Sequence, residues 1–296
     1  MTATQMPWPK KTRELQRALT DSTRWNGFPF RDGDIVIATW PKSGTTWMQQ
    51  IVSQLVFRGA EGIPLDRVSP WLECTLYPPE TVQALEAQTH RRFIKTHLPL
   101  DALVFSPQAK YIYVARDGRD FAWSVYNHIV SMKPEIQALV RGGQPPSMPP
   151  PRDEAQFFRF WLENGAIFGD FWSHQQQWWD ARLLPNVLLV HYNNLKADLP
   201  GEMRRVADFL SIEIDADLWP VLVERCTFGY MKKNGSALVP MMSGLFERGA
   251  DDFIHKGTNG RWRDVLTQED IEKYERLAKE RLTPDCAHWL ATGELQ

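Results

Sequence analysis

Residues 34–57 constrain the possible folds more than any other part of the chain. The apolar run at 34–38 is rich in β-branched residues and predicts a short buried strand. Apolar residues at helical spacing then predict a helix over 45–57. The turn between them reads Thr39-Trp40-Pro41-Lys42-Ser43-Gly44-Thr45-Thr46-Trp47. It brings a lysine, a serine, a glycine and two threonines to a helix N-terminus, where unpaired N–H groups attract anions, so the turn predicts a phosphate site.

The order of residues in this turn separates it from the loop of nucleoside-triphosphate-binding proteins. That loop reads G-x-x-x-x-G-K-[ST], with the lysine after the glycine. Here Lys42 precedes Gly44, and the chain contains no match to that pattern. The alternative is an ordinary strand-to-helix turn in an α/β core, but the convergence of a lysine with several hydroxyls favours an anion site.

Strands and helices are predicted to alternate along the chain. Further buried strands are predicted at 92–96, 110–115 and 186–190. Helices are predicted at 45–57, 78–88, 118–131, 153–164, 166–181, 200–210, 215–225 and 267–282. The proline-rich stretch 144–151 predicts a surface loop. This pattern predicts an α/β fold, a single domain over 1–296 whose mostly parallel central sheet has helices on both faces and binds ligands beyond the carboxyl ends of its strands.

The composition argues against several classes of function. A net charge of -2 argues against general nucleic-acid binding, which requires a basic surface. No stretch approaches about 20 apolar residues, so no membrane span is expected, and the first ten residues lack the apolar core of a secretory signal. Cys74, Cys226 and Cys286 are widely separated, which indicates reduced thiols in a cytoplasmic protein rather than a disulfide framework or a zinc site. No metal is expected.

Polar side chains lie at the ends of two further predicted strands. Lys95 and His97 are two residues apart, so both side chains face one pocket if the strand extends through them. A histidine over a ligand cleft suits a general base, although a lone histidine is more often structural. Arg116 ends the 110–115 strand, and Ser124 follows eight residues later. An arginine there suits a phosphate, and the alternative is a capping pair with Asp117 or Asp120.

Six ordered segments between about residues 34 and 263 resemble motifs of the cytosolic sulfotransferases. The first two are the complete seven-residue match at 41–47 and Lys95-Thr96-His97-Leu98-Pro99. The others contain Arg116 with Ser124, Tyr192 with Lys196, Phe228 with Met231 and Asn234, and Lys256-Gly257 with Gly260 and Trp262. The resemblance implies a bacterial-like sulfotransferase that uses PAPS (3′-phosphoadenosine 5′-phosphosulfate), needs no metal and releases the desulfated product PAP.

The resemblance also implies a role for each matching residue. The 5′-phosphosulfate is expected on the loop residues Lys42, Ser43, Gly44, Thr45 and Thr46. The 3′-phosphate is expected on Arg116, Ser124, His255, Lys256 and Gly257. The adenine is expected against Trp47, Tyr192, Cys226 and Phe228. In catalysis, His97 is expected to act as the base, Lys42 to neutralise the leaving phosphate, Lys95 to sit over the transferring group, and Ser124 to hold Lys42 until both substrates are bound.

Several positions depart from the family pattern. His255 replaces an arginine, and a histidine is charged only near or below pH ~6.5, so weaker phosphate binding is expected at neutral pH. Cys226 replaces a threonine, and Asn193 and Asn194 replace two acids. The chain matches the dimer motif of the family only in part, at Arg263, Thr267, Gln268 and Glu272. The sequence therefore leaves open whether the protein forms a homodimer.

The acceptor is expected to be a small molecule, and a phenol, an alcohol or an amine would each fit. Its pocket is expected to draw on loops 132–151 and 235–252 and on Phe28, Phe30, Trp71, Leu72, Tyr77, Met241, Met242 and Phe246. For the last three, plain packing is the alternative. Two other functions remain. One is a nucleotide-dependent kinase, but the chain lacks the G-x-x-x-x-G-K-[ST] pattern. The other is a non-catalytic sensor of PAPS or PAP, but the presence of Lys42 and His97 favours an enzyme.

Overall fold

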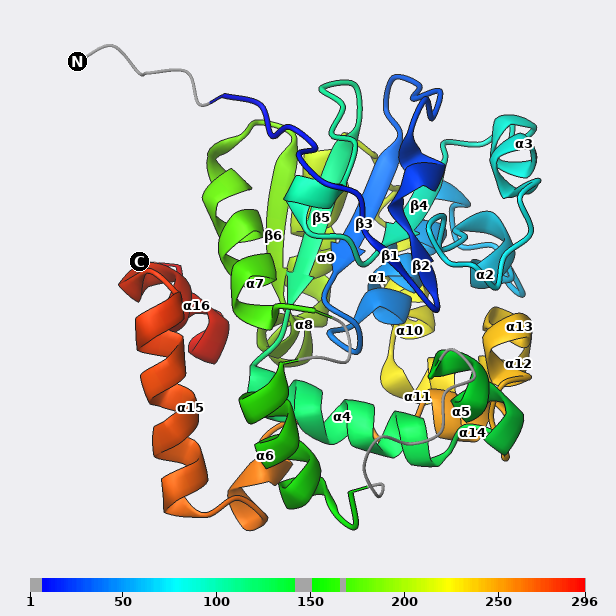
Figure 1. Cartoon of the computed structure of the whole chain (residues 1–296). Coiled ribbons are helices and arrows are strands. Elements are labelled where there is room, and N and C mark those ends of the chain that lie inside the picture. Colours follow the sequence, from blue (N-terminus) through cyan, green and yellow to red (C-terminus); the bar gives the residue numbers. More distant parts are fainter. Residues whose placement is uncertain (1–6, 142–150, 166–168, 296) are drawn as a thin grey trace.

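A four-stranded parallel sheet forms the centre of the structure, a computed structural model that describes residues 7–141, 151–165 and 169–295. The strand order is β4-β3-β5-β6, as Figure 1 shows. The strands are β3 (Ile35–Thr39), β4 (Phe93–Thr96), β5 (Lys110–Ala115) and β6 (Val187–His191). The four predicted strands are therefore confirmed to within one residue, and so is the mostly parallel sheet. A separate pair, β1 (Gln16–Arg17) and β2 (Thr20–Asp21), is antiparallel.

Both faces of the sheet are buried, which explains why its strands are continuous apolar runs. Alternate residues of β3 belong to different cores: Val36 packs in one, and Ile35 and Ile37 pack in the other. The first core joins the sheet to α4 (Gly118–Val130), α6 (Glu154–Asn164), α7 (Phe171–Asp180), α15 (Gln268–Arg281) and α16 (Pro284–Thr292). The second joins it to α1 (Thr45–Val56), α9 (Leu199–Leu210) and α10 (Trp219–Arg225).

The longer predicted helices are present, and their ends follow local capping chemistry. The helix predicted at 166–181 is described from Phe171 onward, where Asp170 caps its N-terminus by accepting from the Ser173 N–H. The helix predicted at 78–88 is the shorter α3 (Thr81–Glu86), since Pro78 and Pro79 precede it. The predicted loop 144–151 lies outside the described residues except for its last residue.

Short helices account for most of what the pattern missed. These are α2 (Leu65–Val68), α5 (Pro134–Val140), α8 (Tyr192–Ala197), α11 (Phe228–Lys233), α12 (Gly235–Leu238), α13 (Pro240–Ser243) and α14 (Ala250–Phe253). Isolated helices of this length are unstable in water, so tertiary contacts rather than local propensity determine them. The helix α16 (Pro284–Thr292) was also missed.

The topology fixes where a ligand would bind. Within the sheet, β4 lies on one side of β3, whereas β5, the next strand along the chain, lies on the other side of β3. The connections that leave β3 and β5 therefore diverge at this point, which is where ligands bind in open parallel sheets. Figure 1 shows α4, α5 and α11–α14 gathered beyond this edge. Among the described helices, none has the length and apolar character needed to cross a bilayer.

Candidate active site

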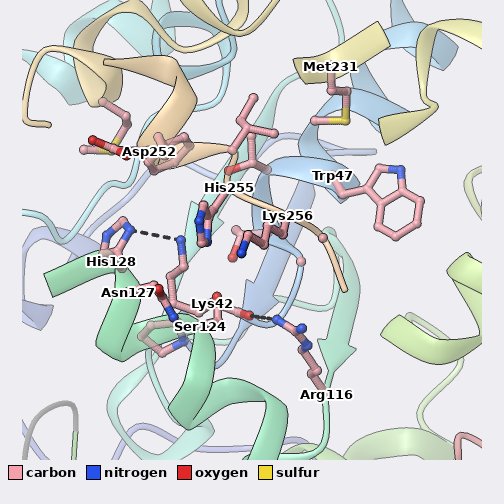
Figure 2. A pocket seen from close by; sticks show the side chains of 18 of the residues that line it. Lys42, Trp47, Arg116, Ser124, Asn127, His128, Met231, Asp252, His255 and Lys256 are labelled. Carbon is pink, nitrogen blue, oxygen red and sulfur yellow. Dashed lines mark hydrogen bonds between the residues drawn. The ribbon is translucent and has the colours of Figure 1, made fainter. Parts of the chain in front are cut away.

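A cavity of about 460 Å³ opens at the carboxyl ends of the strands (Figure 2). One part, here called the polar end, is lined by Lys42, Gly44–Trp47, Arg116, Ser124, Tyr192 and 255–258. Another part, here called the apolar end, is lined by Leu19, Leu76, Met132, Ile136, Val140, Met242, Leu245 and Phe246. Lys95, His97 and Trp71 also line the cavity, so Lys95 of β4 and His97, which follows β4, do share one pocket.

The turn after β3 takes a conformation that only a few residues adopt readily. Lys42 has φ 64° and Gly44 has φ 108°, both in the left-handed region. A Cβ on Gly44 would lie 2.9 Å from Cδ2 of Tyr192, so glycine is required both by its backbone and by this neighbour. The turn thereby brings the first-turn N–H groups of α1 toward the cavity, an arrangement that suits a phosphate. Ser43 is fully buried and is not part of the cavity lining, and its N–H donates to the Trp40 carbonyl.

Lys42 contacts an imidazole that the sequence did not single out. Its Nζ lies 3.0 Å from Nδ1 of His128, one helical turn beyond Ser124 on α4 (Figure 2). Removal from water, with repulsion from Arg116 and Lys95, lowers the pKa of Lys42 to about 7. Burial, together with Lys42 and Lys95, lowers the pKa of His128 well below its usual range, so this ring is neutral and its Nδ1 accepts from the ammonium. Ser124 lines the same cavity, and its predicted hold on Lys42 stays a prediction.

His97 is held in one tautomer by the end of β3. Its Nδ1 lies 2.8 Å from the Thr39 carbonyl oxygen and 3.1 Å from Thr39 Oγ1. A carbonyl only accepts, so Nδ1 carries the proton and Nε2 is left with its lone pair. Burial and the charge of Lys95 lower the pKa of His97 well below its usual range, which keeps the ring neutral. A neutral imidazole with a free Nε2 is the form that a general base requires.

A buried carboxylate that the sequence analysis missed lies behind His97. Glu73 is 0% exposed and accepts a hydrogen bond of 2.7 Å from the His97 backbone N–H. Trp71 lies against both basic side chains, with its ring 4.9 Å from Lys95 Nζ and 4.8 Å from the His97 ring. No periodicity or motif of the kind used above identifies Glu73 as part of a site, because it follows no predicted element, whereas Trp71 was already expected in the acceptor pocket.

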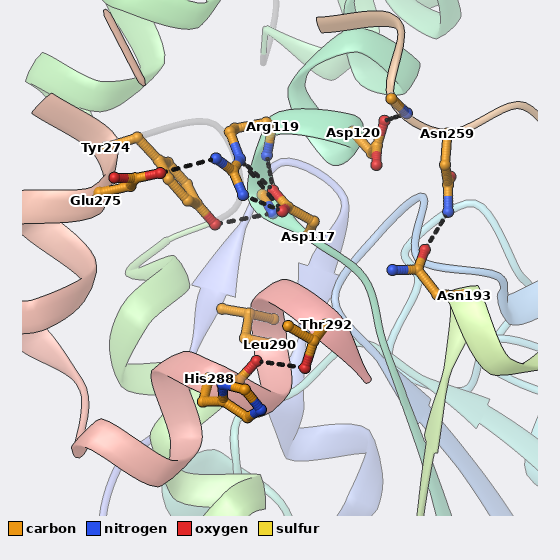
Figure 3. Close-up of polar contacts among 12 residues, drawn as sticks. Asp117, Arg119, Asp120, Asn193, Asn259, Tyr274, Glu275, His288, Leu290 and Thr292 are labelled. Carbon is orange, nitrogen blue, oxygen red and sulfur yellow. Dashed lines mark hydrogen bonds and ion pairs between the residues drawn. The ribbon is translucent and has the colours of Figure 1, made fainter. Parts of the chain in front are cut away.

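Arg116 is tied to the loop that follows α14. Its guanidinium donates to Asn259 Oδ1 at 2.7 and 3.0 Å and to the Thr258 carbonyl at 2.9 Å. Asn259 also donates to Asn193 Oδ1, and Asp120 accepts from the Gly260 N–H at 2.7 Å (Figure 3). The Asn193 that replaces a family acid therefore has a structural partner. These contacts fasten the loop beside the strand end, with the Arg116 guanidinium 4.4 Å above the Tyr192 ring.

Aromatic rings form the outer wall of the polar end. Trp47 meets Tyr192 edge to face at 5.3 Å, and its Nε1 donates to the Cys226 carbonyl at 2.7 Å. Phe228 is 41% exposed, and a Cβ on Gly257 would lie 2.7 Å from its ring. Cys226 itself is fully buried among the apolar residues beneath the cavity rather than in its lining, and burial raises the pKa of its thiol.

His255 and Lys256 follow α14 and line the polar end. Figure 2 shows both side chains in the same part of the cavity as Lys42. Partial burial, with repulsion from Lys256 and Lys232, lowers the pKa of His255. At neutral pH this imidazole is therefore uncharged, and Lys256 carries the positive charge of the segment.

The apolar end departs from the sequence expectation in part. Trp71, Met242 and Phe246 line the cavity as predicted. The other predicted residues are not part of the lining: Phe28, Phe30, Leu72, Tyr77 and Met241. Phe28 and Leu72 pack instead in the core of the first sheet face, since they are nearly or fully buried there. Among the described residues that line the cavity, Asp252 is the one carboxylate. Arg248 donates to its Oδ1 from Nε at 2.9 Å and from Nη2 at 2.6 Å. Across the described residues, no cluster of three or more histidine, cysteine or carboxylate side chains could hold a metal ion.

Comparisons with known proteins agree with this geometry. Residues 32–284 match the family model of the sulfotransferase domain. The chain is 35% identical to a glycolipid sulfotransferase of Mycobacterium bovis (strain BCG / Pasteur 1173P2), over 96% of both chains, and 28% identical to sulfotransferase 1B1 of Mus musculus, over 86% of this chain and 85% of that one. It superposes on retinol dehydratase in complex with androsterone and PAP with a TM-score of 0.71, at 25% identity over 89% of this chain and 84% of that one.

Proposed function

The chain belongs to the sulfotransferase family and is a PAPS-dependent enzyme, and we propose that it transfers the sulfuryl group to a hydroxyl on a largely apolar acceptor with His97 as the base. The observation that carries this proposal is the position of His97. Its Nδ1 is held by the Thr39 carbonyl at 2.8 Å, which leaves Nε2 as the basic nitrogen beside Lys42 and Lys95.

The polar end suits a nucleotide with phosphates at both the 5′ and 3′ positions. Lys42 and the first-turn N–H groups of α1 would hold the 5′ side, and Arg116, Ser124, Lys256 and the Gly257 backbone the 3′ side. The close contacts of aromatic rings with Gly44 and Gly257 support this assignment, since a side chain at either position would displace the neighbouring ring. Bound PAPS supplies an activated sulfuryl group on a phosphate leaving group.

The reaction step follows from the groups around this centre. The acceptor O–H proton passes to Nε2 of His97 as the acceptor oxygen bonds to sulfur and the sulfur–oxygen bond to the phosphate breaks. Lys42 would stabilise the negative charge on the departing phosphate, and Lys95 the charge on the sulfuryl oxygens. Because positioning and electrostatics dominate such transfers, no metal is required in this mechanism.

The charges of the cavity favour a hydroxyl over an amine. Lys42 and Lys95 both line it, and its carboxylate, Asp252, is already paired with Arg248. A protonated amine would therefore be repelled by these lysines and has no lone pair to attack sulfur, so an amine acceptor would have to bind in its neutral form. The apolar end suits the hydrocarbon part of an acceptor, and a glycolipid is one candidate, since the mycobacterial relative is named a glycolipid sulfotransferase.

An acceptor screen tests the proposal. The protein is incubated with PAPS and matched phenols, alcohols, amines and a glycolipid, and the products are examined by mass spectrometry for added SO₃. We expect sulfated hydroxyl compounds and PAP, and little product from amines. Tight PAP binding without product from any acceptor would instead support a sensor, and a faster reaction with amines would overturn the acceptor assignment.

A further inference from the structure

Glu73 occupies an unusual position for a carboxylate. Its segment runs beside the end of β4: the Lys95 N–H donates to the Pro70 carbonyl at 3.0 Å, and Trp71 pairs with Lys95 in a parallel bridge. Glu73 is fully buried, and none of the ion pairs between described residues includes it. An unpaired buried charge is costly unless hydrogen bonds satisfy it, so its surroundings must supply strong donors.

Four donors converge on this carboxylate. Oε1 accepts from Trp71 Nε1 at 2.5 Å, Thr96 Oγ1 at 3.0 Å and the His97 N–H at 2.7 Å. Oε2 accepts from Trp25 Nε1 at 2.9 Å. Because all four partners donate, both oxygens must accept, which is the hydrogen-bonding pattern of the ionised form. Burial raises the pKa of Glu73, and these donors oppose that rise.

Two of these four bonds connect Glu73 to groups that line the cavity, although Glu73 itself does not line it. One bond fixes the backbone of His97, and another fixes the indole of Trp71, whose ring contacts Lys95 and His97. Trp71 and His97 line the cavity, whereas Glu73 does not. A movement of this carboxylate would therefore displace the base and the wall beside it together.

We propose that Glu73 is a positioning residue for sulfuryl transfer, whose carboxylate locks His97 and Trp71 in register. This inference rests on the proposed function, because it assigns Glu73 to the reaction of that site. Burial lowers the pKa of Lys95, while Cys74, Glu73 and Asp66 raise it. Lys95 in turn lowers the pKa values of its neighbours His97 and Lys42. Loss of the Glu73 charge should thus allow Lys95 to lose its proton at lower pH.

Two substitutions at Glu73 separate the effect of its charge from the effect of its side-chain length. Glu73→Gln keeps the size and one accepting oxygen but removes the charge. We expect kcat to fall by about 10- to 100-fold, the scale of a misplaced catalytic group, with PAP affinity within about twofold of wild type. The alkaline limb of the pH profile of kcat should move to lower pH. Glu73→Asp keeps the charge but is one methylene shorter, so kcat should stay reduced while the alkaline limb returns toward its wild-type position.

Asp270→Asn is the matched control. Asp270 is also a buried carboxylate, and it accepts from Thr267 and Arg159 at the start of α15, outside the cavity. Its replacement should lower the melting temperature and leave kcat and the pH profile unchanged. A Glu73→Gln protein with wild-type kcat and pH profile overturns the proposal. So does one that loses PAP binding as much as turnover, because that pattern indicates a purely structural role.

A spectroscopic measurement keeps this test separate from the proposed function. Ring-nitrogen NMR of His97 should report a protonated Nδ1 in the wild type and a mixture of tautomers in Glu73→Gln. If the wild type sulfates no acceptor, the proposed function fails, but the NMR comparison still decides whether Glu73 positions the ring. Identical His97 spectra in both proteins would contradict the positioning role.

Discussion

At the polar end of the cavity, the side chains come from segments far apart in the sequence, which include the turn after β3, the residue after β5 and the loop after α14. Hydrogen bonds cross-link them, as between Arg116 and Asn259. At the apolar end, most of the lining comes from α5, α13 and the residues next to them, with Leu19 and Leu76 from the N-terminal part of the chain, and its members are methionines, aliphatics and Phe246. The first construction fixes charges in place. The apolar end offers an apolar surface, and small substitutions change the shape of that surface. The two ends should therefore respond differently to mutation.

The largest expected effect is at His97, the proposed base, which lines the cavity with Lys95 and Trp71. We expect His97→Ala to lower turnover by roughly 10²-fold or more, because general-base assistance is lost, while PAP affinity barely changes. Steady-state kinetics and PAP calorimetry measure the two quantities. His288→Ala, at a surface histidine near Glu294, is the control. Near-normal turnover of His97→Ala on a hydroxyl acceptor would remove the base from the mechanism.

The next effect concerns the charge of Lys42 at the polar end. The pKa of Lys42 is lowered to about 7 in the free protein, and a bound phosphate favours the ammonium and raises that pKa. PAP binding should therefore take up a proton above pH 7 and weaken as pH rises, by up to about tenfold per unit. Calorimetry from pH 7 to 9 in buffers of different ionisation enthalpy measures both effects.

Lys42→Met supplies the comparison for this pH dependence. It should bind PAP more weakly and lose the proton uptake. His255 does not confuse the result, because its lowered pKa leaves it neutral throughout this range. A wild-type affinity that stays constant from pH 7 to 9, or the same slope in Lys42→Met, would contradict the prediction.

Gly257→Ala and Gly62→Ala test the close fit of the polar end. Both glycines have left-handed backbone, with φ 60° and 67°, so each substitution should cost about 1 kcal/mol of stability. A Cβ on Gly257 would meet Phe228 at 2.7 Å, whereas nothing lies within 4 Å of one on Gly62. Only Gly257→Ala should weaken PAP, by roughly tenfold, since a ring stacked on a base contributes about 1–3 kcal/mol. Equal PAP affinities in the two variants would show that Phe228 does not contact the nucleotide.

His255→Arg should strengthen the polar end. Arginine keeps its charge and offers five donors, whereas the imidazole is neutral at pH 8. We expect PAP to bind more tightly at pH 8 by about 1 kcal/mol, and the gain to shrink as pH falls and the histidine becomes charged. Titrations at pH 6 and pH 8 measure it. An unchanged affinity at both values would mean that residue 255 does not reach the phosphate.

The smallest expected effect lies at the apolar end. Met242→Ala should raise the KM for a hydroxyl acceptor roughly threefold, because about 0.6 kcal/mol of apolar contact is lost, and should leave PAP affinity unchanged. Leu183→Ala is the control, since Leu183 is 73% exposed and does not line the cavity. If Met242→Ala changes PAP affinity as much as KM, the division between the two ends is wrong.

Much of the polar lining of the cavity could be predicted because its residues lie in contiguous motifs at strand ends. Lys42, Lys95, His97 and Arg116 were all placed by spacing and resemblance, and all four line the cavity. Ser43 and Cys226 belong to the same motifs, yet they are buried outside its lining. A motif fixes the path of the backbone through a turn, but not which of its side chains faces the ligand.

The sequence by itself determined the parallel sheet, because continuous apolar strands alternating with amphipathic helices have few other ways to bury their surface. It also determined the anion-binding turn, whose chemistry is local to residues 41–47. Only the tertiary structure decided that His128 meets Lys42 and that Glu73 holds His97 from behind. The Glu73 contact joins residues 24 positions apart, and the His128 contact joins residues 86 apart. The packing of separate elements sets such pairs, which leave no periodic trace in the sequence.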